Sequence, residues 1–238
     1  AGIAVYDGTK VATLKSKGRL KVLSELSHDG ATLPGTVGIG HTRWATHGSP
    51  SDVNAHPHFN KEESIVVVHN GIIENYLKLK KKLEKKGYEF ISETDTEVIA
   101  HLLDYYYKGN PLEAITKIMH RMEGSYALGI IFKDHPEELY AVRKDSPLIV
   151  GHTENGNIIA SDVPAVLKYT RDVYFIENEE IVNKKSLTLP KEITNVIRCK
   201  NPRCITSIEQ ELDHVFILTD PEKEEYRCKY CEEKYHRK

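Results

Sequence analysis

Apolar residues recur along the first three quarters of the chain with the periods of both strands and helices. A continuous apolar run at 65–68 predicts a buried strand. Apolar residues three and four positions apart then predict helices over 72–83, 94–106 and 114–122. Shorter runs predict the remaining elements, which are strands at 1–6, 36–39, 126–132, 139–142, 148–151, 158–160 and 173–176 and short helices at 19–26 and 162–167. Strands on both sides of paired helices indicate an α+β layered domain with mainly antiparallel sheets.

The character of the chain changes after residue 178. The segment 179–190 is polar and has little to bury, and beyond it the chain is short-stranded, charged and Cys-bearing. We therefore expect a first domain over 1–178, a linker over 179–190 and a small all-β domain over 191–238.

Composition excludes several classes of function. The 238 residues are 39% hydrophobic and carry a formal net charge of -2, so bulk charge does not favour nucleic acid or a membrane surface. Because no apolar run approaches a membrane span and no signal peptide is present, we expect a cytoplasmic protein.

The segment 40–48 concentrates candidate chemistry in the first domain. It holds the only Trp of the chain, and it runs from a predicted strand into a Gly/Pro/Ser loop. The fork of Arg43, with Thr46 and His47, suits an α-carboxylate. The alternative interpretation is a strand end at which Arg43 forms an ion pair with a local Glu.

Two other places complete a possible site. Asp95 falls in the first turn of a predicted helix, where a carboxylate stays ionised and can pair with an α-amine. Asn70 and Gly71 fall at a predicted strand-to-helix turn, where a side-chain amide and a backbone N–H can face a developing oxyanion. Together these groups suit acyl transfer from an amino acid. Alternatively, they are a helix cap, a turn and an ion pair that share no site.

Four ordered runs at 40–48, 53–58, 68–75 and 92–101 carry a family resemblance. Residues 1–178 resemble the class II glutamine amidotransferases, specifically the glutaminase domain of glucosamine-6-phosphate synthase. The resemblance implies a layered αββα fold of the N-terminal-nucleophile hydrolase type, with glutamine or glutamate as ligand. It implies that Arg43, Thr46 and His47 bind the glutamine carboxylate and that Asp95 binds the glutamine amine. It further implies that Asn70 and Gly71 form the oxyanion hole, and that Trp44 lies where the loop closes and ammonia is passed on.

The sequence departs from this family at its start. The family begins with a Cys whose thiol attacks the amide while its α-amine acts as base, and Ala1 aligns instead with the family's second stretch. We therefore expect the first domain of this 238-residue sequence to have an incomplete fold, to lack this nucleophile and to be inactive.

All four Cys lie in the last forty residues, with the spacing Cys199-x4-Cys204 and Cys228-x2-Cys231. Two such pairs of thiolates suit a tetrahedral structural Zn²⁺ site with no position open for catalysis. The five His of segment 41–69 offer a second possible metal site, but their spacing is irregular.

Residues 181–238 also resemble a known family, on the runs 189–199, 201–206 and 227–232. They are similar to the zinc domain of the aspartate carbamoyltransferase regulatory chain, which docks that chain onto a catalytic chain. Asn201 matches a contact position, whereas Arg203 replaces the usual Asn. The resemblance implies a protein partner.

The two resemblances join amino sugar and pyrimidine biosynthesis in one chain. A natural fusion, an engineered fusion and an artificial splice all fit the sequence. The first hypothesis is a glutaminase-like domain that binds glutamine, and the second is an interaction protein in which the zinc module docks on a partner. A nucleic-acid-binding zinc ribbon is weaker, because 191–238 carries ten Lys or Arg and ten Asp or Glu.

Overall fold

The computed structural model divides the chain into two compact units, Ala1–Ser186 and Leu187–Lys238. It describes residues 1–43, 48–154, 156–183, 192–194, 197–209, 212–220 and 225–236. Each unit has its own hydrophobic core.

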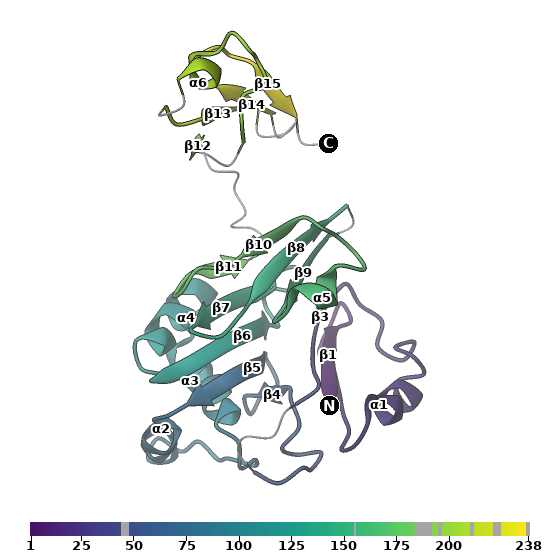
Figure 1. The fold of residues 1–238 in the computed structure, drawn as a ribbon. Coiled ribbons are helices and arrows are strands. Elements are labelled where there is room, and N and C mark those ends of the chain that lie inside the picture. The colour runs from purple at the N-terminus through teal and green to yellow at the C-terminus, as the bar shows by residue number, and fades with distance from the viewer. Residues whose placement is uncertain are drawn as a thin grey trace. The chain divides into compact units, whose positions relative to one another are not determined.

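A five-stranded antiparallel sheet forms the centre of the first unit (Figure 1). Its strands, in order across the sheet, are β11 (Ile181–Asn183), β7 (Tyr140–Lys144), β6 (Gly124–Phe132), β5 (Ile65–Ile73) and β4 (His58–Phe59). Strands β5 and β6 pair along nine residues each. This long pairing makes them the scaffold of the unit.

Two smaller antiparallel sheets form the next layer. One has the order β2 (Val11–Lys15), β1 (Gly2–Tyr6), β3 (Val37–His41), and the other has the order β10 (Val173–Phe175), β8 (Ile149–Thr153), β9 (Gly156–Ala160). Short helices accompany them, α1 (Leu20–Leu26) and α5 (Val163–Val166).

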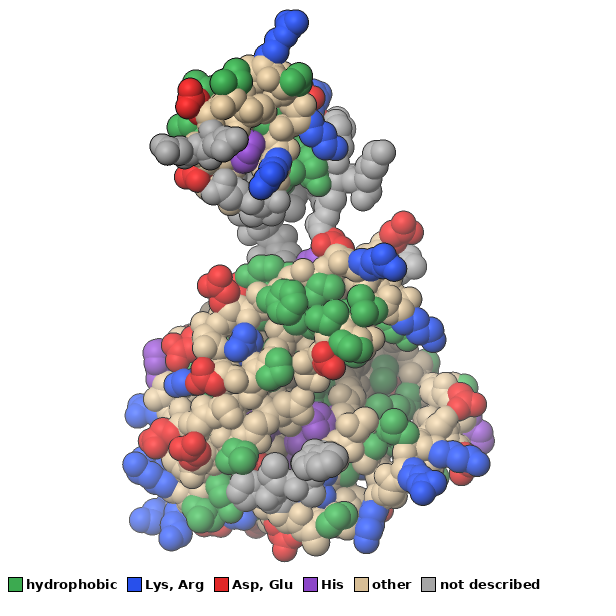
Figure 2. Space-filling view, viewed as in Figure 1, with side chains coloured by type: hydrophobic (Ala, Val, Ile, Leu, Met, Phe, Trp, Pro, Cys, Tyr) green, Lys and Arg blue, Asp and Glu red, His purple; other side chains and the backbone are tan. Residues whose placement is uncertain are grey.

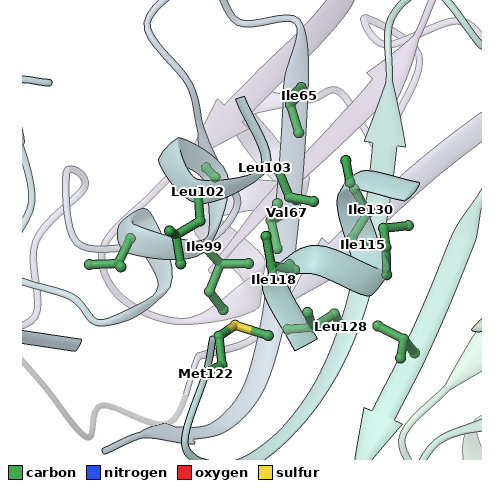
Figure 3. Close-up of a cluster of buried hydrophobic side chains, with 14 of the residues drawn as sticks. Ile65, Val67, Ile99, Leu102, Leu103, Ile115, Ile118, Met122, Leu128 and Ile130 are labelled. Atoms are coloured by element: carbon green, nitrogen blue, oxygen red, sulfur yellow. The ribbon is translucent and has the colours of Figure 1, made fainter. Parts of the chain in front are cut away.

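Three longer helices pack against the opposite face of the central sheet (Figure 1). They are α2 (Tyr76–Glu84), α3 (Thr96–Tyr106) and α4 (Pro111–Met119). Figure 3 shows their apolar side chains meeting those of the sheet, with Ile99, Ile115 and Ile118 facing Val67 and Leu128.

The two-residue period of β5 explains the layers. Ile65 and Val67 join the core beneath the helices, while Val66 joins Ala4 and Ile39 on the other side of the sheet. Because both faces of β5 are buried along its first half, the run at 65–68 is continuously apolar. The structure confirms the α+β layered class and the antiparallel pairing that the sequence predicts.

Strand β5 is longer than its apolar run predicts. It continues through Ile73, so Asn70 and Gly71 lie inside a strand and not at a strand-to-helix turn. Ile72, expected on the buried stripe of a helix, is 41% exposed, because α2 begins only at Tyr76. Pairing with β6 overrides the helical spacing of these residues.

The expected linker over 179–190 also needs correction. Its residues 181–183 form β11, which pairs with β7. Val182 is buried against Ala141 and Leu148, and this burial explains why a mostly polar segment adds a strand. Residues 184–190 lie outside the described residues.

The second unit contains a four-stranded antiparallel sheet and one helical turn. The sheet order is β12 (Glu192–Thr194), β13 (Val215–Asp220), β14 (Glu225–Cys228), β15 (Lys234–His236), and the turn is α6 (Ile205–Ile208). Its core includes Phe216 and Tyr226 beside the Cys residues. So small a core needs another source of stability.

Among the described residues, no helix combines the length and the hydropathy that crossing a bilayer requires.

Candidate functional site

The end of β3 carries the first candidate residues. His41 ends the strand, and Arg43 follows it with a positive φ of 52°. The backbone N–H of Arg43 donates to Nδ1 of His41 at 2.8 Å. Its guanidinium donates to the carbonyl oxygens of Gly48 (3.0 Å) and Ser49 (3.2 Å). The other candidates of this loop lie outside the described residues: Trp44, Thr46 and His47.

Glu93 anchors the loop that the Arg43 guanidinium contacts. The backbone N–H of Glu93 donates to Oδ1 of Asn54, and Nδ2 of Asn54 donates to a Glu93 carboxylate oxygen, both at 2.9 Å. The same oxygen accepts from Ser49 N–H at 3.3 Å. Burial lowers the pKa of Arg43, and the nearby charge of Glu93 opposes that shift. A local Glu therefore acts on Arg43 electrostatically, while the guanidinium also contacts the loop carbonyls.

Asn70 and Gly71 of β5 pair with Ala127 and Tyr126 of β6, respectively. Gly71 has φ 126°, and a Cβ built on it would lie 2.1 Å from the carbonyl oxygen of Ser125. Only glycine fits there. Oδ1 of Asn70 lies 2.5 Å from Nε2 of His41, so the two strands are joined through these side chains.

Asp95 is buried just before α3, at 3% exposure. Its Oδ2 accepts from the backbone N–H of Ile73 at 2.9 Å and lies 3.9 Å from Nδ1 of His69. The carboxylate therefore bridges to the end of β5 rather than capping its own helix.

A chain of side-chain contacts connects these three places. Nδ1 of His56 lies 2.9 Å from Nδ1 of His41, and Nε2 of His56 lies 2.9 Å from Oγ1 of Thr96, the residue after Asp95. The contacts thus connect Asn70, the backbone N–H of Arg43 and Thr96, while the Arg43 guanidinium contacts the loop carbonyls. Figure 2 shows a group of His side chains near the middle of the viewed face of this unit.

Burial opposes protonation of His41, His56 and His58. Burial lowers the pKa of His41, an effect that the Asn70 hydrogen bond opposes. Burial and the surrounding His and Arg side chains lower the pKa of His56 well below its ordinary value, and burial lowers that of His58 to about 3. Neutral imidazoles form directional hydrogen bonds without adding charge to the site.

Sequence reasoning missed His41, His56 and Thr96 as parts of the site. Their partners are 15 to 40 residues away in sequence, so no local spacing connects them. The only available signal was the concentration of His in segment 41–69. The structure does not support a metal site there: among the described residues, the only group with suitable ligand geometry is the four Cys.

The four Cys of the second unit converge from three parts of its chain. Cys199, Cys204, Cys228 and Cys231 place their sulfur atoms within 4.8 Å of one another, and two pairs are 3.5 and 3.7 Å apart. A disulfide requires about 2.05 Å. Tetrahedral thiolates around one ion at Zn–S distances of about 2.3 Å lie about 3.8 Å apart. The spacing therefore fits one ion and no disulfide.

The environment of the cluster affects its thiols differently. Burial raises the pKa of Cys199 and Cys228. Burial acts in the same direction on Cys204, but hydrogen bonds from the hydroxyl and backbone of Thr206 outweigh it and lower the pKa to about 7. A bound cation would hold all four as thiolates, as metal ligation requires.

Two family models match the chain, one in each unit. Residues 41–168 match the glutamine amidotransferase domain. Residues 191–238 match the metal binding domain of the aspartate carbamoyltransferase regulatory chain. Both resemblances read from the sequence are thereby confirmed.

Curated relatives match mainly the first unit. The glutamine–fructose-6-phosphate aminotransferase (isomerizing) of Clostridium acetobutylicum is 58% identical over 182 residues, which is 76% of this chain and 30% of that protein. The enzyme of the same name from Clostridium perfringens is 53% identical over 217 residues, 90% of this chain and 34% of that protein. The chain therefore spans about a third of the length of these relatives.

A solved structure also matches the fold. The glutamine phosphoribosylpyrophosphate amidotransferase from B. subtilis superposes with a TM-score of 0.66 at 26% identity, covering 76% of this chain and 40% of that one. The layered arrangement of the first unit is thus that of N-terminal-nucleophile amidotransferases.

Proposed function

Since this chain belongs to the glutamine amidotransferase domain family, we propose that its first unit binds L-glutamine or L-glutamate by the amino-acid end. The observation that carries the proposal is the series of contacts through His41 and His56 that connects Asn70 with the Arg43 backbone and with Thr96, the residue after Asp95. The cation of Arg43, the amide of Asn70 and the carboxylate of Asp95 correspond to the three parts of the ligand.

Arg43 is assigned the α-carboxylate, together with Thr46 and His47. Its guanidinium now donates to two neutral carbonyl oxygens. Charge-assisted bonds to a carboxylate are roughly twice as strong as neutral ones, so a ligand would compete effectively for the guanidinium. Trp44, in the same loop, is assigned to closure over the ligand.

Asp95 is assigned the α-amine. Its carboxylate is buried beside the N-terminal end of α3 and already accepts from Ile73 N–H. An ammonium group supplies three further donors to such a carboxylate. Because this carboxylate is buried, removing either partner of the pair would leave an uncompensated buried charge.

Asn70 and Gly71 are assigned the carbonyl oxygen of the ligand's side-chain amide. The Asn70 amide nitrogen and the Gly71 backbone N–H are the donors, and the absence of a Cβ at Gly71 permits the backbone geometry. Such donors stabilise the negative oxygen of a tetrahedral intermediate.

Hydrolysis needs a nucleophile as well as these donors. All four Cys of the 238 residues lie in the cluster of the second unit, so none is available to attack the amide. We therefore propose that the 238-residue chain binds glutamine without hydrolysing it. Ammonia release above the buffer background would contradict this.

Calorimetric titration of the metal-loaded chain with L-glutamine and with L-glutamate tests the binding proposal. We expect binding that Arg43→Ala weakens at least tenfold. Arg171→Ala, which removes an exposed arginine elsewhere in the first unit, is the matched control and should leave affinity unchanged. Equal binding by wild type and Arg43→Ala would overturn the carboxylate assignment.

For the second unit we propose a structural Zn²⁺ held by the four Cys, and docking on a protein partner. Four thiolates and no other ligand favour Zn²⁺ over oxygen-seeking cations. The match to the regulatory-chain domain and the exposed Ile205 and Ile208 of α6 support a docking role. The proposed partner is a carbamoyltransferase catalytic chain. A pull-down with that chain should succeed with the metal-loaded protein, and failure with both metal-loaded and metal-free protein would remove this second function.

A further inference from the structure

Three histidines, one threonine and Asn70 form a continuous series of contacts, which we call the histidine relay (His69, Thr96, His56, His41, Asn70). Nδ1 of His69 lies 3.1 Å from Oγ1 of Thr96, and that oxygen lies 2.9 Å from Nε2 of His56. Nδ1 of His56 lies 2.9 Å from Nδ1 of His41, whose Nε2 lies 2.5 Å from Oδ1 of Asn70. The relay therefore links β5, α3, the loop before β4, and β3.

One backbone group fixes the direction of the relay. The Arg43 N–H can only donate, and it points at Nδ1 of His41 at 2.8 Å. That nitrogen must be the bare acceptor. A neutral imidazole then carries its proton on Nε2, so His41 donates to Asn70.

The bare Nδ1 of His41 also determines the donors and acceptors of His56, Thr96 and His69. Nδ1 of His56 faces the bare nitrogen of His41, so it carries the proton and shares that acceptor with Arg43 N–H in a three-centre arrangement. Nε2 of His56 is then bare and must receive the Thr96 hydroxyl proton. The Thr96 oxygen remains as an acceptor for Nδ1–H of His69.

We propose that the histidine relay has a single proton order, running from His69 to Asn70, which holds Asn70 Oδ1 as acceptor and so directs its Nδ2–H₂ donors at the ligand. His41, His56 and Thr96 are thus positioning residues for the oxyanion donor, and His41 also ties that donor to the backbone of Arg43. This inference rests on the proposed glutamine site for its functional meaning, but the proton order is a property of the chain alone.

The charges around the relay support neutral imidazoles. Burial and the Arg43 charge oppose protonation of His41, and burial together with any charge on the neighbouring His41, His58, His69 and Arg43 opposes protonation of His56. A second proton on His41 would place Nδ1–H against two donors. Asp95, 3.9 Å from Nδ1 of His69, favours a proton on that nitrogen.

Histidine side-chain ¹⁵N NMR on the full metal-loaded chain without ligand tests the proton order. At pH 7 we expect His41 as the Nε2–H tautomer, and His56 and His69 as Nδ1–H tautomers. His28, which is exposed, serves as a reference for an unconstrained mixture of tautomers. Nδ1–H on His41, or averaged tautomers at His41 and His56, would overturn the relay.

Two substitutions of Thr96 link the order to ligand binding. Thr96→Val removes the hydroxyl but keeps the shape, whereas Thr96→Ser keeps the hydroxyl. We expect Val to abolish the single tautomer of His56 and to weaken L-glutamine binding about tenfold, and Ser to restore both. Because Val keeps the shape of Thr and Ser loses its methyl group, a packing effect would weaken the Ser variant, whereas loss of the hydroxyl donor affects only the Val variant.

The outcomes separate the relay from the proposed function. If wild type shows the expected tautomers but does not bind glutamine, the glutamine site is wrong and the proton order stands. If wild type binds glutamine and Thr96→Val binds equally well, the positioning role is wrong. If the tautomers differ from those above, the proton order is wrong whatever the affinity.

Discussion

Gly71 occupies a backbone conformation that other residues adopt only under strain. Its φ is 126°, and an added Cβ would lie 2.1 Å from the Ser125 carbonyl, a backbone atom that cannot rotate away. Residue identity at this position is therefore set by the close pairing of β5 and β6. The positive φ also orients the N–H that we assign to the oxyanion.

Gly71→Ala should consequently lower the free energy of unfolding by about 2–3 kcal/mol or more, measured by chemical denaturation. Gly87→Ala is the matched control: Gly87 also has positive φ, at 90°, but nothing lies within 4 Å of its added Cβ. It should cost only about 1 kcal/mol. Equal losses would mean that the Ser125 contact does not matter.

Glu97 is a buried carboxylate whose charge state should govern acid stability. Burial opposes ionisation, but His101, whose Nε2 lies 3.5 Å from Oε1 of Glu97, and hydrogen bonds from Ser92 and the Ile91 backbone outweigh it and lower the pKa of Glu97 to about 2. A depressed folded-state pKa contributes stability above the unfolded value, near 4.5, and that stability is lost as pH falls toward 2.

Glu97→Gln should therefore be less stable than wild type by about 3 kcal/mol at pH 7, and the difference should shrink between pH 4.5 and 2. Urea unfolding at several pH values measures it. A difference that stays constant with pH would show that the contribution of Glu97 is not its charge.

The local sequence predicts a helix or strand correctly where its apolar residues are regularly spaced or consecutive. It fails where hydrogen bonding to a neighbouring strand sets the end of the element. The helices α3 and α4 were predictable from their apolar spacing, and strands β5 and β6 from runs of consecutive apolar residues that are buried on both faces. The end of β5 was not, since nine paired residues of β6 extend it past Gly71.

The start of α3 shows how a local signal can be partly right. Thr94 and Glu97 have capping-box spacing, and the Glu97 N–H reaches Thr94 Oγ1 at 3.4 Å. However, the Glu97 carboxylate accepts from the backbone of Ile91 and Ser92, so it organises the preceding loop instead. The relay could not be predicted, because its contacts join four separate elements.

Asp95 and Thr96 lie at the start of α3, and the apolar side chains of α3 that pack in the core hold this helix in place. Ile99 is fully buried between helices and sheet. Ile99→Ala should lower the free energy of unfolding by about 2–5 kcal/mol in thermal or chemical denaturation. Leu112→Ala on α4, where the side chain is 39% exposed, should cost much less and serves as the control.

At the scale of the whole molecule, the two units differ in what stabilises them. The first has a large apolar core shared by helices and sheets, whereas the second surrounds four Cys with a few apolar side chains. A structural Zn²⁺ contributes about 10 kcal/mol or more to domains of this kind. Metal should therefore be dispensable for the first unit and essential for the second.

Titration with a chelator, followed by far-UV circular dichroism, tests this division. We expect β-signal from the second unit to be lost while the helical signal remains, because α1 to α5 all belong to the first unit. Cys204→Ser should reproduce the chelated state without chelator. A large loss of helical signal would contradict separate stabilisation.

The central claim is that Arg43 binds the α-carboxylate and Asp95 binds the α-amine of one amino acid. The most direct test compares the affinity for L-glutamine with that for its analogue lacking the α-amine, in wild type, Arg43→Ala and Asp95→Asn. We predict that wild type prefers L-glutamine, that Asp95→Asn loses this preference, and that Arg43→Ala weakens both ligands. An Asp95→Asn variant that keeps the full preference would show that Asp95 does not bind the amine, and the account of the site would be wrong.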